Sequence, residues 1–505
     1  MVRRTMCAVL LMSAMTSHAA AQAQPSAVTN YAPVAPETTL KVKPILFEGP
    51  MASTIGVEVS DQFRGEFVDW FATPADSPIK NFRYNFLGNR FKLGLRVKRD
   101  PFEVFVQYQH SLLDNLPEGG PGPGGAYFAN TRHTFQESSI LRAAWARLKV
   151  PEFADGRLSV QGGRQTYSDG AEAVPKDPTL QWLVQNRIGQ RLIGPFEYTM
   201  VGRSFDGGIL AYQGDQVNVT GFGFKPTQGG YEINANPEIP GITVGGLAFT
   251  MRDTELVQGT TGRFFWIQYE DHRDIVFLDN QPLPVREAEK GKGASIATIG
   301  ANVEHVHDVG PGRLDLLGWG VGQFGSWLSQ DQRAWAYAIE AGYQLPDVWA
   351  KPWMRIGIDS GSGDTNPNDD VHGTFFQLLP TSRQYAQFPF YNLMNNQDVF
   401  AQWLLLPSSQ VNVRADLHWL RVNASEDLSY SGSGATKEDF FGYAGVPAKG
   451  RNNLAYLTDV AVTYTPIAPL TFYAYYGHAF GQGVINANFN GTQANFGYVE
   501  AILKF

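Results

Sequence analysis

The feature that most constrains this chain is a one-by-one alternation of apolar and polar residues that recurs from one segment to the next. Segment 90–98 shows it most clearly, because Phe91, Leu93, Leu95 and Val97 alternate with Arg90, Lys92, Gly94, Arg96 and Lys98. Successive side chains of a β-strand point to opposite faces, so this pattern predicts a strand with one oily face and one charged face. Alternation alone fits a soluble sandwich as well as a membrane barrel.

The number and spacing of these segments favour the barrel. About eighteen of them follow one another, separated by short turns, such as 99–101 and 310–312, and by long connections, such as 166–199 and 360–396. Bacterial outer-membrane barrels have an even number of antiparallel strands, short periplasmic turns and long extracellular loops. We therefore expect an all-β protein, a single transmembrane antiparallel barrel of about 18 strands. The connection 252–263 is long for a turn and leaves about 16 strands as the alternative.

Both ends of the chain fit a protein exported to the outer membrane. Residues 1–23 carry Arg3 and Arg4 near their start, continue with an apolar run and end in a small-x-small cleavage site, the pattern of a secretory signal peptide. The last alternating segment ends at Phe505, which resembles the insertion signal read by the barrel assembly machinery. We predict an N-terminal periplasmic extension at 24–50 and a barrel at 51–505, in the outer membrane of a Gram-negative-type bacterium.

Composition agrees with this class and excludes others. The only cysteine, Cys7, lies within the predicted signal peptide, so the mature chain is expected to have no disulfide and no thiol nucleophile. No later run reaches the roughly 18 to 20 apolar residues of a membrane-spanning helix. Aromatic residues make up 13% and charged residues 17% of the chain. This balance suits a barrel, because aromatic girdles mark the membrane interfaces and the lipid face excludes charge. A net charge of -8 argues against nucleic acid as a partner.

Three short motifs resemble the alginate export family of outer-membrane porins. They are Gly163-Arg164-Gln165 followed by Asp169-Gly170, then Arg203-Ser204-Phe205-Asp206-Gly207, and finally Asp359 to Asp364 running into Phe376 and Leu379-Pro380-Thr381. The resemblance implies an arginine-lined pore through which an anionic polysaccharide leaves the cell passively. Outer-membrane lipid and periplasmic export proteins would be further partners. Segment 113–130 and the long step from Tyr167 to Arg203 depart from the family pattern, and both lie in predicted loops.

Cations on the polar faces of the predicted strands are the candidate substrate-binding residues of the lumen. Parity selects Arg64, Arg90, Lys92, Arg96, Arg355 and Arg414, and the motifs add Arg164, Arg203 and Asp206. Fixed cations in a narrow channel attract carboxylates, and the planar guanidinium of arginine pairs well with them. The structural alternative is a ladder of salt bridges, because Glu58, Glu66 and Asp416 share these faces. For Arg203 the alternative is a link to Asp206 at the strand end.

Two groups of residues are candidate metal ligands. A candidate calcium site in an extracellular loop consists of four aspartates: Asp359, Asp364, Asp369 and Asp370. Their spacing does not match an EF-hand loop, and a solvated loop is the alternative. His305 and His307 share one strand face, but no third ligand follows at a useful spacing. A location at the membrane interface is the alternative for this pair, and no other cofactor is expected.

Sequence signatures of enzymes are absent. The chain contains no G-x-S-x-G elbow, no H-E-x-x-H, no P-loop and no dinucleotide-binding fingerprint directly after a predicted strand. We therefore expect a porin, not an enzyme, that exports an alginate-like anionic polysaccharide. One alternative is a general or substrate-specific porin for the uptake of small anionic solutes. Another, from a different class, is an outer-membrane enzyme with a Ser/His pair or an adhesin that uses the long loops.

Overall fold

The computed structural model describes residues 45–75, 77, 79, 81–153, 155–252, 258–381 and 385–505. The predicted signal peptide and most of the predicted periplasmic extension lie outside these residues. No described helix combines the length and the apolar character that a membrane crossing requires.

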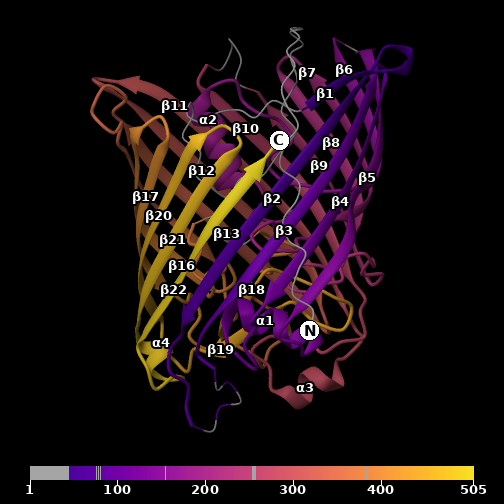
Figure 1. Ribbon diagram of the computed structural model, residues 1–505. Helices are drawn as coiled ribbons and strands as arrows, with labels where there is room; N and C mark the ends of the chain where they lie inside the picture. Colours follow the sequence, from indigo (N-terminus) through magenta and orange to yellow (C-terminus); the bar gives the residue numbers. More distant parts are fainter. Residues whose placement is uncertain are drawn as a thin grey trace, which may run out of the picture. The chain divides into compact units, whose positions relative to one another are not determined.

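Eighteen antiparallel strands, each paired with its neighbours along the chain, form a closed barrel (Figure 1). In chain order they are β2 (Ser53–Asp69), β3 (Arg83–Arg99), β4 (Phe102–Asp114), β5 (Gln136–Phe153), β6 (Gly156–Gln165), β7 (Phe205–Gly214), β8 (Val217–Pro226), β9 (Ile242–Met251), β10 (Thr260–Asp271), β11 (Ala294–Val309), β12 (Gly312–Trp327), β13 (Gln330–Gln344), β14 (Trp353–Gly361), β16 (Asn396–Ser408), β17 (Val411–Arg421), β20 (Asn453–Ile467), β21 (Leu470–Gly481) and β22 (Gln493–Lys504). Strand β22 closes the barrel by pairing with β2, from Ser60 opposite Lys504 to Asp69 opposite Asn495. The predicted strand number of 18 is confirmed.

Short turns join the strands at one end of the barrel, as predicted. An example is 100–101, which links β3 to β4. The same end holds β1 (Ile45–Gly49), which is joined to β2 by the turn η1 (Pro50–Ala52) and pairs with the start of β2. The C-terminus lies at this end too. The connection 252–259 between β9 and β10 also belongs to this end, and its residues 253–257 lie outside the described residues.

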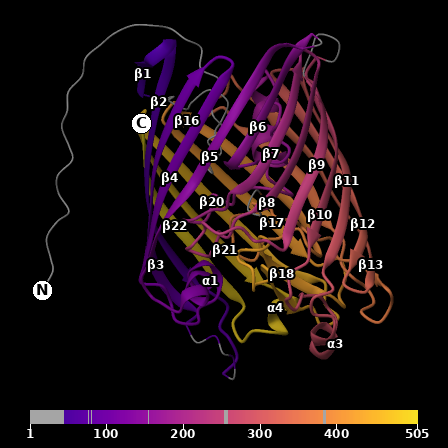
Figure 2. The same ribbon diagram turned by 90° about the vertical axis from the view of Figure 1, so that its right-hand side faces the viewer.

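Long connections dominate the other end, where they carry α1 (Gly122–Thr131), α3 (Leu283–Ala288) and α4 (Gly483–Asn486) (Figure 2). One connection at this end, 328–329 between β12 and β13, is a two-residue turn. The predicted contrast between the two ends therefore holds, but the alternation of short and long connections is not strict.

The two faces of the wall are those that the alternation predicts. Apolar side chains of the outward face are exposed in the isolated chain, for example Leu87 (59%), Ile339 (61%) and Val499 (61%). Most inward positions are buried and polar, charged or aromatic. Hydrocarbon stabilises an apolar outer band of this kind, whereas in water the band would drive aggregation.

Three of the long connections begin at the predicted extracellular end and fold inward. They are 166–204 with α2 (Pro178–Leu183) and η2 (Val184–Ile188), 362–395 with the short strand β15 (Val371–His372), and 422–452 with the hairpin of β18 (Leu428–Gly432) and β19 (Tyr443–Pro447). The first two join where Leu379 N donates to Leu192 O at 2.9 Å. Both of these leucines are fully buried in one apolar cluster with the inner wall. The lumen is therefore occupied by the chain's own loops.

Candidate functional site

The loop 166–204 extends through the lumen to the short-turn end of the barrel. The Asp177 carboxylate accepts from Arg313 Nη2 on β12 at 2.5 Å, and Thr179 Oγ1 accepts from Gln344 Nε2 on β13 at 2.9 Å. Both partners stand at the short-turn ends of their strands. Asp177 also caps α2, because its carboxylate accepts from two backbone N–H groups of the first turn. In Figure 1, α2 lies near the end of the barrel that holds β1 and the C-terminus.

Six buried charges meet where η2 lies against β12, β13 and β14, and together they form the central ion cluster: Arg187, Arg191, Arg355, Asp315, Glu340 and Asp359. Arg187 Nε lies 3.1 Å from Glu340 Oε2, and Arg191 Nη1 lies 3.0 Å from Asp359 Oδ1. Arg355 pairs with Glu340 at 2.7 Å and also with Asp315. No side chain of the six is more than 2% exposed. Because three cations balance three carboxylates, the cluster is neutral and closed to solutes.

The same loop supplies a carboxylate to the wall at β3 and β5. Glu197 lies 2.9 Å from Arg90 Nη1 and 2.7 Å from Lys92 Nζ, and it also accepts from Arg142 Nη2. Burial disfavours the carboxylate, but the three cations outweigh burial and hold the pKa of Glu197 well below its usual range. Glu197 is therefore a strong electrostatic anchor for the loop.

Arg64 extends this group of charges to the seam between β2 and β22. It pairs with Glu66 at 3.1 Å and with Glu500, and its guanidinium lies over the Tyr198 ring of the loop, 4.8 Å from the centroid. We name the whole set the wall cluster: Arg64, Arg90, Lys92, Arg142, Glu66, Glu197 and Glu500. It contains four cations and three carboxylates, so it carries an excess of positive charge.

A third group, the mouth cluster, lies at the short-turn end and consists of Arg96, Arg147, Lys149, Glu58 and Glu103. The Glu103 carboxylate pairs with Arg96 Nη1 at 2.7 Å and with Lys149 Nζ at 2.6 Å. The cationic side chains are 23% (Arg96), 33% (Arg147) and 34% (Lys149) exposed. The ring of Trp145 lies beside the guanidinium of Arg147, with 4.8 Å from Cζ to the centroid. Three cations against two carboxylates give an accessible, positively charged mouth.

Two further predicted residues lie in the lumen with protein partners. Arg414 on β17 pairs with Asp416 at 2.5 Å and donates to the backbone carbonyl of Tyr385. Arg203 precedes β7 instead of lying in it, and its guanidinium donates to the carbonyls of Ser433 and Ala435. Both arginines therefore tie inner loops in place, and a role in substrate binding stays a prediction for them.

Arg164 and Asp206 do not line the lumen, so that part of the prediction is wrong. Arg164 Nη2 lies 2.6 Å from Asp206 Oδ2, across the β6 and β7 pair. Val160 and Leu210 share their parity on these strands and are 49% and 51% exposed on the outward face. The inward neighbour Phe205 is fully buried in the core. The motif match suggested the lumen, but strand parity places this salt bridge on the outer surface.

We expect that the Arg164→Ala variant conducts with unchanged ion selectivity, because its charge faces away from the pore. Arg96→Ala should lower the preference for anions by about two- to threefold, as expected for loss of one fixed charge from a pore mouth. Reversal potentials under a salt gradient in planar bilayers measure the ion selectivity of both variants. A selectivity change in Arg164→Ala as large as that in Arg96→Ala would contradict the outward placement.

The candidate calcium ligands do not converge. Asp359 is in the central ion cluster, Asp364 Oδ1 accepts from Asn366 N at 3.1 Å, and Asp369 Oδ1 accepts from Val371 N at 3.0 Å. Among the described residues, metal-ligating side chains gather in one group, which does not contain these aspartates or Asp370. Calcium binding therefore stays a prediction, because these carboxylates do not form a shared coordination site.

His305 and His307 have parallel rings with centroids 6.2 Å apart. Their inward neighbours on β11, Glu304 and Val306, are buried, so the two imidazoles lie on the outward face near the turn 310–311. This placement agrees with the membrane-interface alternative for the pair.

Several cations of the lumen were not predicted from the sequence, for a structural reason. A β-bulge at Arg142 shifts the register of β5, since Gln107 faces Ala143 whereas Tyr108 faces Leu141. Arg142 and Ala143 are both buried, so residues on either side of the bulge follow opposite parities. The local alternation of Arg147, Leu148, Lys149 and Val150 was the available signal for the mouth cluster.

Docking of the inner loops should depend on pH. Burial raises the pKa of Asp169 in loop 166–204 to about 6 against the pull of Arg263, and burial raises the pKa of Asp427 in loop 422–452 to about 6. A carboxyl with a raised pKa stabilises the docked state at pH values below its ordinary pKa, near 4, and this stabilisation is lost as the pH rises through 6. We expect lower conductance at pH 5 than at pH 7.5, and a smaller difference in Asp169→Asn. Equal conductance at both pH values in the unmodified protein would contradict this.

Comparisons with known proteins agree with the barrel fold. A family model described as alginate export matches residues 83–488. No curated protein sequence matches the chain. Among solved structures, OccK2 (OpdF) of Pseudomonas aeruginosa is similar with a TM-score of 0.54 and 8% identity, over 89% of this chain and 97% of that one. OccAB2 of Acinetobacter baumannii is similar with a TM-score of 0.55 and 9% identity, over 89% and 98% of the two chains. Identities this low show the fold alone.

The family match decides the classification. It extends from β3 to α4 and so covers most of the barrel together with all three inward loops. The resemblance predicted from three short motifs is thereby confirmed, and the family and fold are those of passive channels. The chain belongs to the alginate export family and is an outer-membrane β-barrel porin.

Proposed function

We propose that this porin exports an anionic polysaccharide of the uronic-acid type, such as alginate, from the periplasm without covalent chemistry. The observation that carries the proposal is the accessible mouth cluster at the short-turn end, with three cations against two carboxylates. Short turns face the periplasm in outer-membrane barrels. A polymer of carboxylates would therefore meet excess positive charge where export begins.

The wall cluster gives the next step of the passage. Arg90, Lys92 and Arg142 hold Glu197, which is a carboxylate of the protein itself. A uronate carboxylate has the same charge and the same planar oxygen pair, so it would replace Glu197 as loop 166–204 moves aside. Several weak sites in a row allow a chain to advance from one to the next, because each contact is lost as another forms.

Uptake of small anionic solutes is the second candidate function. The central ion cluster favours it, because three buried cations there are fully matched by three carboxylates and loops occupy the lumen. A polymer requires these loops to shift over a long path, whereas a small solute requires less displacement. The same fixed cations would serve either solute.

Single-channel recordings in planar bilayers separate the two functions. An exporter of uronate polymers should prefer anions and should be blocked by oligouronates of increasing length with increasing affinity when they are added at the short-turn side. A small-solute porin should prefer anions too, but block should not increase beyond the monomer or dimer. Cation preference without block would contradict both.

A further inference from the structure

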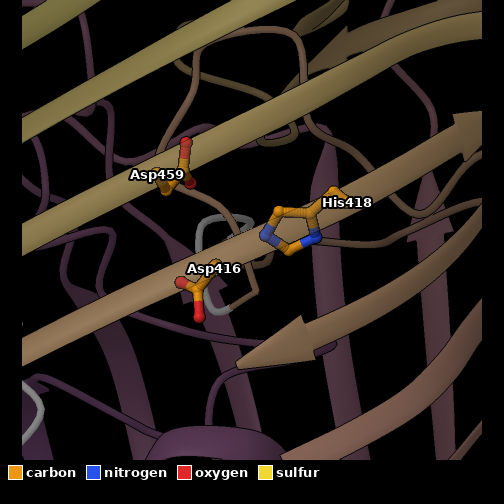
Figure 3. Close-up of side chains that lie close together, drawn as sticks. All are labelled: Asp416, His418 and Asp459. Atoms are coloured by element: carbon orange, nitrogen blue, oxygen red, sulfur yellow. The ribbon is translucent and has the colours of Figure 1, made fainter. Parts of the chain in front are cut away.

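Three side chains with metal-ligating atoms converge on the inner wall at β17 and β20. Asp416 and His418 are two residues apart on the inward face of β17, and Asp459 on β20 stands directly opposite Asp416. One ligand atom of each lies within 4.8 Å of the other two. Figure 3 shows one ring nitrogen of His418 turned toward the space between the two carboxylates. All three residues are at least nine-tenths buried, with 3%, 4% and 6% exposed surface.

The hydrogen bonds around this group are incomplete. Among the described residues, no donor reaches either carboxylate oxygen of Asp459 in hydrogen-bonding geometry, and His418 Nε2 also has no partner. The hydroxyl of Tyr475 approaches Asp459 as a hydrogen-bond donor, but the pair does not reach full hydrogen-bonding geometry. Buried polar atoms without a partner are costly, roughly 1–3 kcal/mol each and more for charged groups. The unsatisfied atoms belong to two different strands and face one another, which points to a shared ligand.

The partners behind the three side chains orient them as second-shell groups orient metal ligands. Asp398 Oδ2 lies 2.8 Å from His418 Nδ1, so a proton on Nδ1 leaves the lone pair of Nε2 facing the carboxylates. Asp416 accepts from Gln402 Nε2 at 2.7 Å and from Arg414 Nε at 2.5 Å. A carboxylate has about four lone-pair sites, so Asp416 keeps capacity for a cation.

The local charge also favours the binding of a cation. In the deprotonated forms that a metal ion requires, Asp398, Asp416 and Asp459 bring three negative charges, and Arg414 brings one positive charge. With a neutral His418 imidazole, the sum is a deficit of two positive charges in a buried place. A divalent ion would neutralise the group, and uncompensated buried charge is strongly destabilising.

We propose that Asp416, His418 and Asp459 bind one divalent transition-metal ion of the zinc type on the lumen wall. One imidazole nitrogen and two carboxylates suit such an ion, whereas calcium and magnesium prefer oxygen ligands alone. Bonds of about 2.0–2.2 Å place tetrahedral ligand atoms about 3.4 Å apart, so the side chains close in by about an ångström. The ion would fasten β17 to β20 beside Arg414, and this site does not rest on the proposed function.

Titration of the metal-stripped, detergent-solubilised barrel with Co²⁺ and Zn²⁺ tests the proposal. We expect one Co²⁺ per chain with the visible absorption of a four-coordinate ion, displaced by Zn²⁺. The Asp459→Asn and His418→Gln variants should each weaken Zn²⁺ binding at least 100-fold by calorimetry. Asp398→Asn should weaken it by about 10- to 100-fold. The matched control is His305→Gln with His307→Gln, which removes a close histidine pair on the outward face and should leave binding unchanged.

X-ray absorption of the zinc-loaded, unmodified protein gives a test that does not depend on the folding of variants. The expected first shell has one imidazole and two or three oxygen ligands. A shell with two imidazoles or binding without a one-to-one end point would overturn the proposal. So would a Zn²⁺ affinity of Asp459→Asn and His418→Gln equal to that of the unmodified protein.

Discussion

The Glu197→Gln variant should conduct more than the unmodified porin, with longer open times, because loop 166–204 loses one of its buried electrostatic anchors. Glutamine keeps the shape of glutamate but leaves Arg90, Lys92 and Arg142 facing one another without a carboxylate between them. Removing one side of a buried ion pair costs about 3–5 kcal/mol. If the docked loop bears that cost, the open population increases by about two to three and a half orders of magnitude.

The same variant should bind oligouronates at least about tenfold more tightly, because the competing carboxylate is gone. Single-channel conductance, open time and the concentration that gives half block are the measurements. Glu238→Gln is the matched control, since it removes an equal charge from an exposed position of another long connection and should behave like the unmodified protein. If Glu197→Gln has the conductance and the block of this control, Glu197 does not hold the loop.

Strand positions and faces could be predicted from the sequence because a barrel wall repeats one physical constraint. Hydrocarbon outside and polar groups inside force every second residue to be apolar. The alternation along one strand therefore indicates which side chains face the membrane and which face the lumen. Segment 90–98 shows this well, because Leu93 and Leu95 are exposed on the outside while Arg90, Lys92 and Arg96 reach charged partners inside. The terminal strand follows the same rule, and its partner β2 closes the barrel.

The salt-bridge partners could not be predicted in this way, since they come from segments without a period. Glu197 and Arg191 lie on a long connection without a periodic pattern, and only the fold brings them to β3 and β14. The bulge at Arg142 breaks the alternation on which parity depends. For Arg164 and Asp206, short motifs pointed to the lumen although Val160 and Leu210 gave the correct outward parity. Where motif and parity disagree in a barrel, parity has the stronger physical basis.

Reversing two charges at the mouth should turn the porin from anion-preferring to cation-preferring. In the Arg147→Glu and Lys149→Glu double variant, three cations and two carboxylates become one cation and four carboxylates. Because these side chains are about one-third exposed, mobile ions sample their field directly, and the change should be largest at low salt, where screening is weakest. We expect the permeability ratio of chloride to potassium to fall by at least about tenfold, equivalent to about 1.4 kcal/mol.

Reversal potentials at two ionic strengths measure this effect, and oligouronate block should disappear together with the anion preference. Arg83→Glu with Arg333→Glu is the matched control, since both side chains are strongly exposed near the other end of the barrel. If the double reversal prevents folding, Arg147→Gln with Lys149→Gln leaves Glu103 with Arg96 and should give about half of the change in free energy, because it changes half as many charges. Unchanged selectivity in the mouth variants, or an equal change in the control, would show that the mouth does not select the solute. An electrostatic field that acts at the entrance must respond to charge at the entrance and not to charge at the opposite rim.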